Sequence, residues 1–420
     1  MQSKYRFSDI NIDMNKIITL IVIGLSVILP FNCYANIANG TSGSSKWEID
    51  DNGVLTISPS KGKVGKLEKW EDWRSGVSPW HKYRSKITHV KFVKKIYTET
   101  CYAMFMDCEL LETVDFGQFN IDASDNMEYM FSGCKSLKEI DMSTLNTDNV
   151  VHMNNMFANC TSIKSIDLST FDTYKVKTMG MMFYNCTSLE YVDVARWHTL
   201  NVEEMQYMFF NCKKLKELNL HFWDMRGVVN TTSMFDNCVC LENIDMRYFA
   251  TYAGTMKNTF RNCQSLESLN LTAFMGGESD SDGFFKGCDN LKKFYAYYKD
   301  PFMWTINEDI FREIKEPEKI ILYVPRASVE LYKSAPGWKI FDVRAMEDEP
   351  KESSDNTDKD NPEGKNSNDS DDKPTGNPVT GVDAITTSCQ SSTVYTLSGK
   401  RLVAPRKGIN IVNGKKYFVK

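Results

Sequence analysis

Apolar side chains return at a regular interval over residues 101–295, and a cysteine marks that interval most clearly. It recurs as Cys108, Cys134, Cys160, Cys186, Cys212, Cys238, Cys263 and Cys288, first every 26 and then every 25 residues. Eight copies of one segment at a nearly fixed period are typical of a repeat protein whose copies stack on one another. The pattern therefore predicts a solenoid over residues 101–295, with one copy in each coil.

Each copy has two halves that differ in their hydrophobic period. After the cysteine, apolar residues such as Leu218 and Leu220 alternate with polar ones, which indicates a strand with one buried face. Before the cysteine, M-x-x-M-F places Met205, Met208 and Phe209 at spacings of three and four, which favours a short helix. Strand plus helix is the leucine-rich-repeat plan, so we expect an α/β solenoid. A parallel β-sheet would line one face and short helices the other.

The repeated cysteine lies between the expected helix and the expected strand, where small buried residues fill the corner of a coil. We therefore interpret the eight cysteines as a ladder of buried structural thiols. Disulfides between neighbouring coils are an alternative, because export would permit them. A zinc site has less support, since the chain has no C-x-x-C motif and its five histidines do not cluster with the ladder.

An acidic column follows the strands on their outward face. The residue between the last two apolar positions of each copy is Asp115, Asp141, Asp167, Asp193, Asn219, Asp245 or Asn270. Carboxylates in line repel one another, so something compensates for their charge. Hydrogen bonds from neighbours such as Ser143 and Ser169 are one explanation, and a basic partner surface or a cation is the other. We predict partner binding by this column and by its neighbours Glu139, Tyr191, Glu217 and Arg247.

Two further patterns in the repeats point to structure. An aromatic column after the strands is expected to pack in the core of a turn: Phe119, Phe171, Trp197, Trp223, Phe249 and Phe274, with Leu145 in register. In the seventh copy, Asp280, Asp282 and Gly283 hint at a cation-binding loop. They lack the twelve-residue spacing and the closing glutamate of a calcium loop, so we expect a surface insertion.

The segments around the repeats suggest caps, a linker and a small terminal unit. Residues 36–100 read as an N-terminal β cap with two strands turned at residues 51–53, and residues 296–346 as a C-terminal cap with a strand and a short helix. Residues 347–380 carry 11 acids and 4 lysines without an aromatic residue, which indicates a disordered acidic linker. Residues 381–420 resume strand patterns and include a hairpin turn at Asn413-Gly414.

Residues 1–35 read as a signal peptide. Lys16 precedes an apolar run from Ile17 to Leu29, and Ala35 stands where cleavage is expected. Met14 is the start that this pattern favours. A lipid attached at Cys33 and a membrane anchor are the alternatives, although the apolar run is shorter than a membrane span requires. We expect an exported protein.

Charge and composition add few candidate activities. The formal net charge is -5, so no basic stripe suggests nucleic acid. The sequence shows no nucleophile–base pair, metal cluster or phosphate loop, and we expect neither an enzyme nor a cofactor.

Several motifs together are similar to one known family. The segments "WEIDDNGVLTIS", "SPW" and "LYVPRASVELYKSAPGWKIF", with the repeats between them, resemble the BspA-like leucine-rich-repeat surface proteins of Bacteroidetes. The M-x-x-M-F-x-x-C form of the repeat resembles a variant shared with mycoplasma surface proteins. The resemblance covers about Trp47 to Val343. The tail resembles type-nine secretion sorting domains through "LSGK", "KGINIVNGKK" and the terminal lysine, with Asn410 where tyrosine is usual.

The resemblance implies a protein at the cell surface (outer membrane) or secreted, exported by secretion machinery that reads the tail. It also implies a sheet face that binds proteins of a host or of neighbouring bacteria, and it supplies no catalytic residues. A glycan-binding or structural cell-envelope protein is the alternative.

Overall fold

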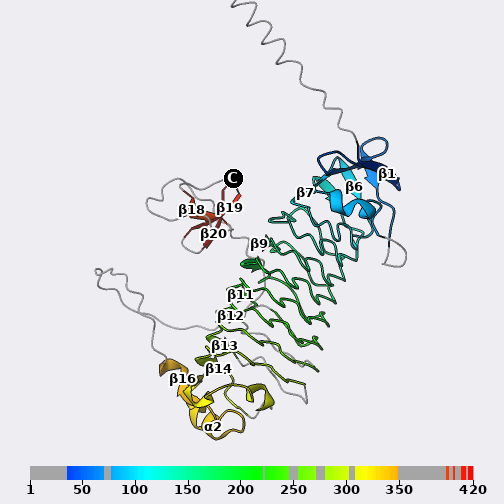
Figure 1. Ribbon diagram of the computed structural model, residues 1–420. Helices are drawn as coiled ribbons and strands as arrows, with labels where there is room; N and C mark the ends of the chain where they lie inside the picture. Colours follow the sequence, from blue (N-terminus) through cyan, green and yellow to red (C-terminus); the bar gives the residue numbers. More distant parts are fainter. Residues whose placement is uncertain are drawn as a thin grey trace, which may run out of the picture.

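A computed structural model shows an elongated stack of similar coils between two caps (Figure 1). It describes residues 36–70, 77–220, 223–245, 254–270, 280–301 and 308–348, and the backbone of the strands within residues 394–419. The expected signal peptide and nearly all of the expected linker lie outside the described residues. Within the described part of the chain, no helix is long and apolar enough to span a membrane.

The N-terminal cap opens the stack with two sheets and a buried tryptophan cluster. One sheet has the order β1 (Ala38–Ser42), β2 (Ser45–Ile49), β3 (Val54–Pro59), β5 (His89–Phe92), β7 (Thr113–Asp115). The other has the order β4 (Val64–Lys66), β6 (Lys95–Tyr97), β8 (Gln118–Asn120), and the 3-10 helix η1 spans His81–Lys86. β2 and β3 are antiparallel and joined by the expected turn, where Asp50 Oδ1 accepts the N–H of Val54 at 2.8 Å.

Short parallel strands line one side of the coils. They are β9 (Ser165–Asp167), β10 (Tyr191–Asp193), β11 (Glu217–Asn219), β12 (Asn243–Asp245), β13 (Ser268–Asn270) and β14 (Lys293–Tyr295). β9 pairs with β10 and β11 with β12, each residue facing its counterpart 26 positions on, as Ile166 faces Val192. The parallel sheet is therefore assembled from short hydrogen-bonded groups of strands.

The segment before each cysteine forms consecutive turns, so the expectation of short helices was wrong for the coils described. The N–H of Met130 reaches the carbonyl of Met127 at 3.3 Å, whereas the N–H of Phe131 bonds the carbonyl of Met156 in the next coil at 2.9 Å. Tyr129 has φ of 57°, which no α-helix of L-residues accommodates. Half of the amides thus join neighbouring coils instead of closing helical turns.

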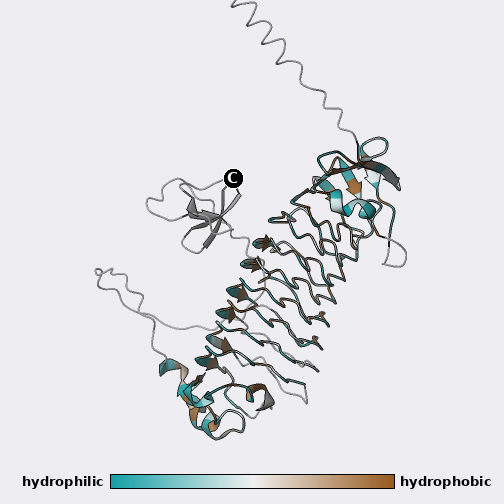
Figure 2. Cartoon of the chain, viewed as in Figure 1, coloured by the Kyte–Doolittle hydropathy of each residue, from teal (hydrophilic) through white to brown (hydrophobic). Residues whose placement is uncertain are grey.

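Identical side chains stack in columns through the core. The rings of Phe131, Phe157, Phe183 and Phe209 are stacked with centroids 5.2 to 5.8 Å apart. Hydrophobic and hydrophilic residues alternate along the coils over the whole stack (Figure 2). The methionines before each phenylalanine are buried as the pattern predicted, and so is the expected aromatic column at Phe119, Leu145, Phe171, Trp197 and Trp223. Phe249 and Phe274 lie outside the described residues.

The cysteine ladder consists of buried free thiols. Cys134, Cys160 and Cys186 are fully buried, and each Sγ donates to the carbonyl of a phenylalanine 29 residues earlier, at 3.1 to 3.2 Å. The same contact recurs at Cys212, Cys238, Cys263 and Cys288, and Cys108 is buried at the start of the ladder. All the cysteines within the described residues are free. The ladder therefore has the structural role that the sequence predicted.

The C-terminal cap extends the parallel sheet. It contains η3 (Glu308–Phe311), η4 (Pro317–Lys319), β15 (Ile321–Val324), η5 (Arg326–Ser328), α2 (Val329–Ser334), β16 (Asp342–Ala345) and η6 (Met346–Asp348). β14, β15 and β16 are parallel neighbours, so the cap continues the stack before closing it. Glu347 and Asp348, expected in the linker, both pair with Arg326.

The terminal unit contains β17 (Val394–Thr396), β18 (Arg401–Leu402), β19 (Gly408–Val412) and β20 (Lys415–Val419). Their order is β18-β17-β19-β20, and β19 and β20 are antiparallel. The expected turn residues Asn413 and Gly414 lie outside the described residues. The pairing of Val412 with Lys415 is the one that the predicted hairpin requires.

Candidate binding face of the strands

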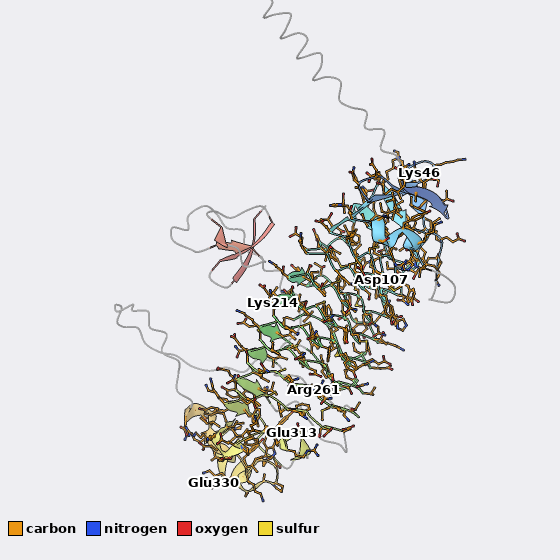
Figure 3. The ribbon with its side chains drawn as sticks, viewed as in Figure 1. Lys46, Asp107, Lys214, Arg261, Glu313 and Glu330 are labelled. Atoms are coloured by element: carbon orange, nitrogen blue, oxygen red, sulfur yellow. The ribbon has the colours of Figure 1, made fainter. Side chains whose placement is uncertain are left out.

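The strand face consists of the first and third residues of each three-residue strand. Their middle residues point inward, and Ile166, Val192 and Leu218 are 1 to 4% exposed. Successive side chains of a strand alternate between faces, so the flanking residues point away from the core. Glu217, Asn219 and Asp115 are exposed there, and Tyr191 is 38% exposed. Lys214 lies on this side of the stack and Asp107 on the opposite side (Figure 3).

Most of the aspartates whose contacts are described hydrogen-bond the backbone two residues further on. Asp141 Oδ1 accepts the N–H of Ser143 at 3.0 Å and its hydroxyl at 2.6 Å, and Asp167 makes the same two bonds with Ser169. Asp115 Oδ1 accepts the N–H of Gly117 at 3.0 Å. These bonds stabilise the carboxylates and fix the turn. The hydrogen-bonding explanation for the acidic column therefore accounts for at least these three positions.

The acidic column is not uniformly exposed, which corrects the expectation of a continuous outward stripe. Asp193 and Asn270 are only 8% and 7% exposed, and Asp167 is half-buried. Burial, Asp193 and Asp167 together raise the pKa of Tyr191 to about 12, since a phenol beside carboxylates resists ionisation. The side chain of Asp245 and all of Arg247 lie outside the described residues.

Glu139 and Asp141 lie where the sheet is interrupted. No strand forms at residues 139–141, although β7 and β9 lie in the coils on either side. The N–H of Lys164 is 3.5 Å from the carbonyl of Lys138, whereas the corresponding distance from Glu190 to Lys164 is 2.8 Å. Ile140 is accordingly half-buried, while its counterpart Ile166 is buried. The described site residues therefore follow one side of the stack, but they do not form one regular sheet.

Lysines from neighbouring coils interleave with acids close to the strand face. Lys135 pairs with Glu109 at 2.8 Å and Lys292 with Glu267 at 2.6 Å, all four side chains being more than half exposed. Such exposed pairs each contribute about 0–1 kcal/mol to stability. They moderate the charge of this side, so its acidity is concentrated in the aspartate column and in Glu139 and Glu217.

An asparagine ladder runs beside the cysteines, and the sequence analysis missed it. Asn185 Nδ2 donates to Asn159 Oδ1 at 2.9 Å, Asn211 donates to Asn185, and Asn237 donates to Asn211 at 3.1 Å. All four have φ between 59° and 68°, the left-handed conformation that asparagine tolerates best among residues with a side chain. The recurrent Asn-Cys pair was the available signal. The N-x-S/T sequences at Asn159 and Asn185 therefore belong to this ladder.

The seventh copy presents no open cation loop among its described residues. Asp282 pairs with Arg312 and lies 3.8 Å from Lys257 Nζ, which is 3.9 Å from Asp280. Within the described part of the chain, no group of three or more histidine, cysteine, aspartate or glutamate side chains could hold a metal ion. Residues 271–279, the rest of the expected insertion, lie outside the described residues.

The stacked coils, parallel strands and interior ladders define a repeat protein of leucine-rich-repeat type. A family model described as "Mycoplasma protein of unknown function, DUF285" matches residues 99–217 and 191–274, under half of the chain. The central coils are therefore similar to that family. No curated protein matches the chain.

Three solved structures show the same kind of similarity at low sequence identity. A leucine-rich cell surface protein from Faecalibacterium prausnitzii is 15% identical, with 62% of this chain and 89% of that chain covered and a TM-score of 0.22. A leucine-rich repeat protein from Eubacterium ventriosum is 16% identical, with 61% and 90% covered and a TM-score of 0.19. The pneumococcal vaccine antigen PcpA is 13% identical, with 73% and 98% covered and a TM-score of 0.24.

Proposed function

We propose that this chain is an exported leucine-rich-repeat solenoid, displayed at the cell surface or secreted, that binds proteins through its strand face. Adhesion to host or bacterial surface proteins is the role that this proposal entails. The observation that carries it is the group of exposed carboxylates on the strand side of the stack, Asp115, Glu139, Asp141 and Glu217. Stacked coils hold these side chains at a fixed spacing, and variation on such a scaffold changes the partner without changing the fold.

The chemistry of the face favours a basic partner. Glu139, Asp141, Glu217 and Asp115 are exposed carboxylates, and Tyr191 adds an amphipathic ring between them. Tyrosine is enriched at protein interfaces because its ring buries apolar area while its hydroxyl still bonds. Complementary charge steers association and makes it sensitive to salt.

Paired substitutions test the strand face without altering its turns. Asp141→Asn with Asp167→Asn removes two charges, while the asparagine Oδ1 still accepts the bonds from Ser143 and Ser169. A charge pair 4 Å apart in water contributes about 1 kcal/mol, or about fivefold in affinity. We therefore expect a lysine- and arginine-rich test peptide to bind the double variant up to about 25-fold more weakly, with a shallower dependence of affinity on salt.

The matched control is Asp148→Asn with Asp172→Asn, which also removes two negative charges, from exposed residues away from the strand face. Calorimetric titration at two salt concentrations measures both quantities for the wild type and each variant. An unchanged affinity and salt dependence in the double variant, or an equal loss in the control, would remove the strand face from consideration.

A glycan-binding role is the second candidate, and one cluster favours it. Tyr295 stacks on Tyr297 with ring centroids 6.4 Å apart and on Tyr323 at 5.6 Å, and Tyr297 is 47% exposed. An exposed aromatic ring offers an apolar surface to the face of a sugar ring. Retention of the wild type on immobilised polysaccharide, with loss in Tyr297→Ala but not in the double aspartate variant, would favour this second role.

A further inference from the structure

One edge of the stack, away from the strand face, carries exposed apolar side chains in adjacent coils. Tyr174 is 62% exposed and Leu200 is 50% exposed, and they occupy equivalent positions 26 residues apart. Asp148 precedes them at the same position and Arg226 follows, and both are exposed. Arg226 also pairs with Asp224 of its own coil at 2.6 Å. Along the stack this column therefore reads acidic, apolar, apolar, basic. Large apolar groups at the surface commonly mark an interaction site when they adjoin one another.

We propose that this edge binds a second copy of the chain, with the two stacks antiparallel. A two-fold axis perpendicular to the stack, between the coils of Tyr174 and Leu200, makes each column face itself in reverse. Asp148 then faces Arg226 of the second copy, and Tyr174 faces its Leu200. Neighbouring strands lie about 4.8 Å apart, so the four positions span about 14 Å along the stack.

The neighbouring columns are complementary about the same axis. Lys177 and Glu203, both exposed, face each other across the axis, and Val151 faces Val229, which is 57% exposed. On the other side of the central column, Asp172 faces His198, and both are exposed. The residues of all three columns are therefore complementary in the same antiparallel register of a second copy.

Other registers bring like charges together. An axis through the coil of Tyr174 places Lys177 opposite its own copy, and an axis through the coil of Leu200 does the same for Glu203. A parallel arrangement about an axis along the central column places Asp148 opposite Asp148 and Arg226 opposite Arg226. Like charges in contact strongly disfavour association, so the antiparallel register centred between these coils is the one that the edge fits.

This inference is independent of the proposed function, because the edge and the strand face share no residue. A patch of four coils lies at the small end of stable interfaces, so we expect a reversible dimer that forms at micromolar concentrations. Sedimentation velocity of the chain from residue 36 to its end, from about 1 to about 500 µM, measures the dimerisation constant.

Charge reversal identifies the surface. Asp148→Arg places two arginines opposite each other and is expected to weaken dimerisation at least about tenfold, whereas Asp148→Arg with Arg226→Asp restores the complementary pair. Glu190→Arg is the matched control, since it makes the same charge change at an exposed position elsewhere and is expected to dimerise like the wild type. Circular dichroism confirms that each variant is folded.

The possible results divide cleanly. A dimer lost in Asp148→Arg and recovered in the double variant supports the inference. A wild type that stays monomeric up to the highest concentration overturns it, and so does a dimer that Asp148→Arg leaves unchanged. Equal weakening by Glu190→Arg also overturns it, because overall charge would then explain the effect.

Discussion

Substitution of Asn185 tests which interactions join neighbouring coils, because its side chain and its backbone conformation contribute separately to stability. The side chain donates to Asn159 and accepts from Asn211, and the backbone holds φ of 59°. The same column contains Gly133 and Gly287 near its ends, with φ of 77° and 79°. Glycine therefore adopts the left-handed backbone conformation of this position but makes no side-chain hydrogen bonds to the ladder. Alanine makes no such bonds either, and it is strained in this conformation.

The structure gives a graded expectation for the free energy of unfolding. Either substitution removes two side-chain hydrogen bonds, which costs about 1–3 kcal/mol in total. Asn185→Ala also pays about 1–2 kcal/mol for a left-handed alanine. Asn185→Gly avoids that strain and loses about 0.5–1 kcal/mol through the greater freedom of its unfolded chain. We therefore expect both variants to be less stable than the wild type, and alanine to be worse by about 0.5–1 kcal/mol.

Urea denaturation followed by far-ultraviolet circular dichroism measures these differences through the midpoint at constant slope. Asn146→Ala is the matched control. Asn146 donates to Asp122 and accepts from Asp148, but it is exposed and lies outside the left-handed region. Its loss should cost at most about 1 kcal/mol. If Asn185→Gly is destabilised as much as Asn185→Ala, the left-handed backbone does not contribute to the difference. If both variants are as stable as the wild type, the side-chain ladder does not stabilise the stack.

Three further predictions concern the thiols, the strand face and the repeat. Burial raises the pKa of Cys186 to about 12. The thiols of the folded protein should therefore resist an alkylating reagent at pH 8 and react fully after unfolding in urea. Rapid labelling of Cys186 in the folded protein would contradict this. With its pKa raised to about 12, Tyr191 should ionise well above an ordinary tyrosine near 10, and its contribution to stability should be present below pH 10 and be lost as pH rises through 12. Difference ultraviolet titration of the wild type against Tyr191→Phe measures that shift, and a step near pH 10 would contradict it. Deleting residues 153–178 removes one whole period and should leave a shorter folded stack, whereas deleting residues 153–165 should unfold its centre; equal stability of the two by urea denaturation would contradict the stacking argument.

Much of the fold could be predicted because burial repeats with the sequence. The apolar residues on either side of each cysteine predicted the strands and the core, and the turn at residues 51–53 predicted the antiparallel pair β2 and β3. The helices were wrong because M-x-x-M-F has the same spacing in consecutive turns as in a helix. The deciding residues have φ near 57°, such as Tyr129, Asn155 and Met181. This left-handed backbone conformation ends each turn and permits bonds to the next coil, and the apolar spacing of the motif does not reveal it.

The candidate site was less predictable because exposure on a strand depends on neighbouring coils. Asp141 and Asp193 occupy equivalent positions, yet one is exposed and the other is 8% exposed. Asp193 lies in β10, which is hydrogen-bonded to β9, whereas Asp141 lies in a coil where the sheet is interrupted. Sequence periodicity identifies which positions point outward, but the pairing of neighbouring strands, which differs from coil to coil, decides how much of each remains accessible.

The division between uniform interior and variable exterior also relates the two proposed surfaces. Phenylalanine, cysteine and asparagine recur in the interior columns, so these columns are the same in every coil that contains them. The strand face around Tyr191 and the edge around Tyr174 differ from coil to coil, and they lie on separate sides of the same central coils. An antiparallel dimer through the edge would leave both strand faces open to partners. Two equivalent faces on one particle bind a partner-bearing surface more tightly than one does, by about 10²–10⁴-fold when geometry permits both to engage. A weak edge contact would thus strengthen attachment without any change in the strand face itself.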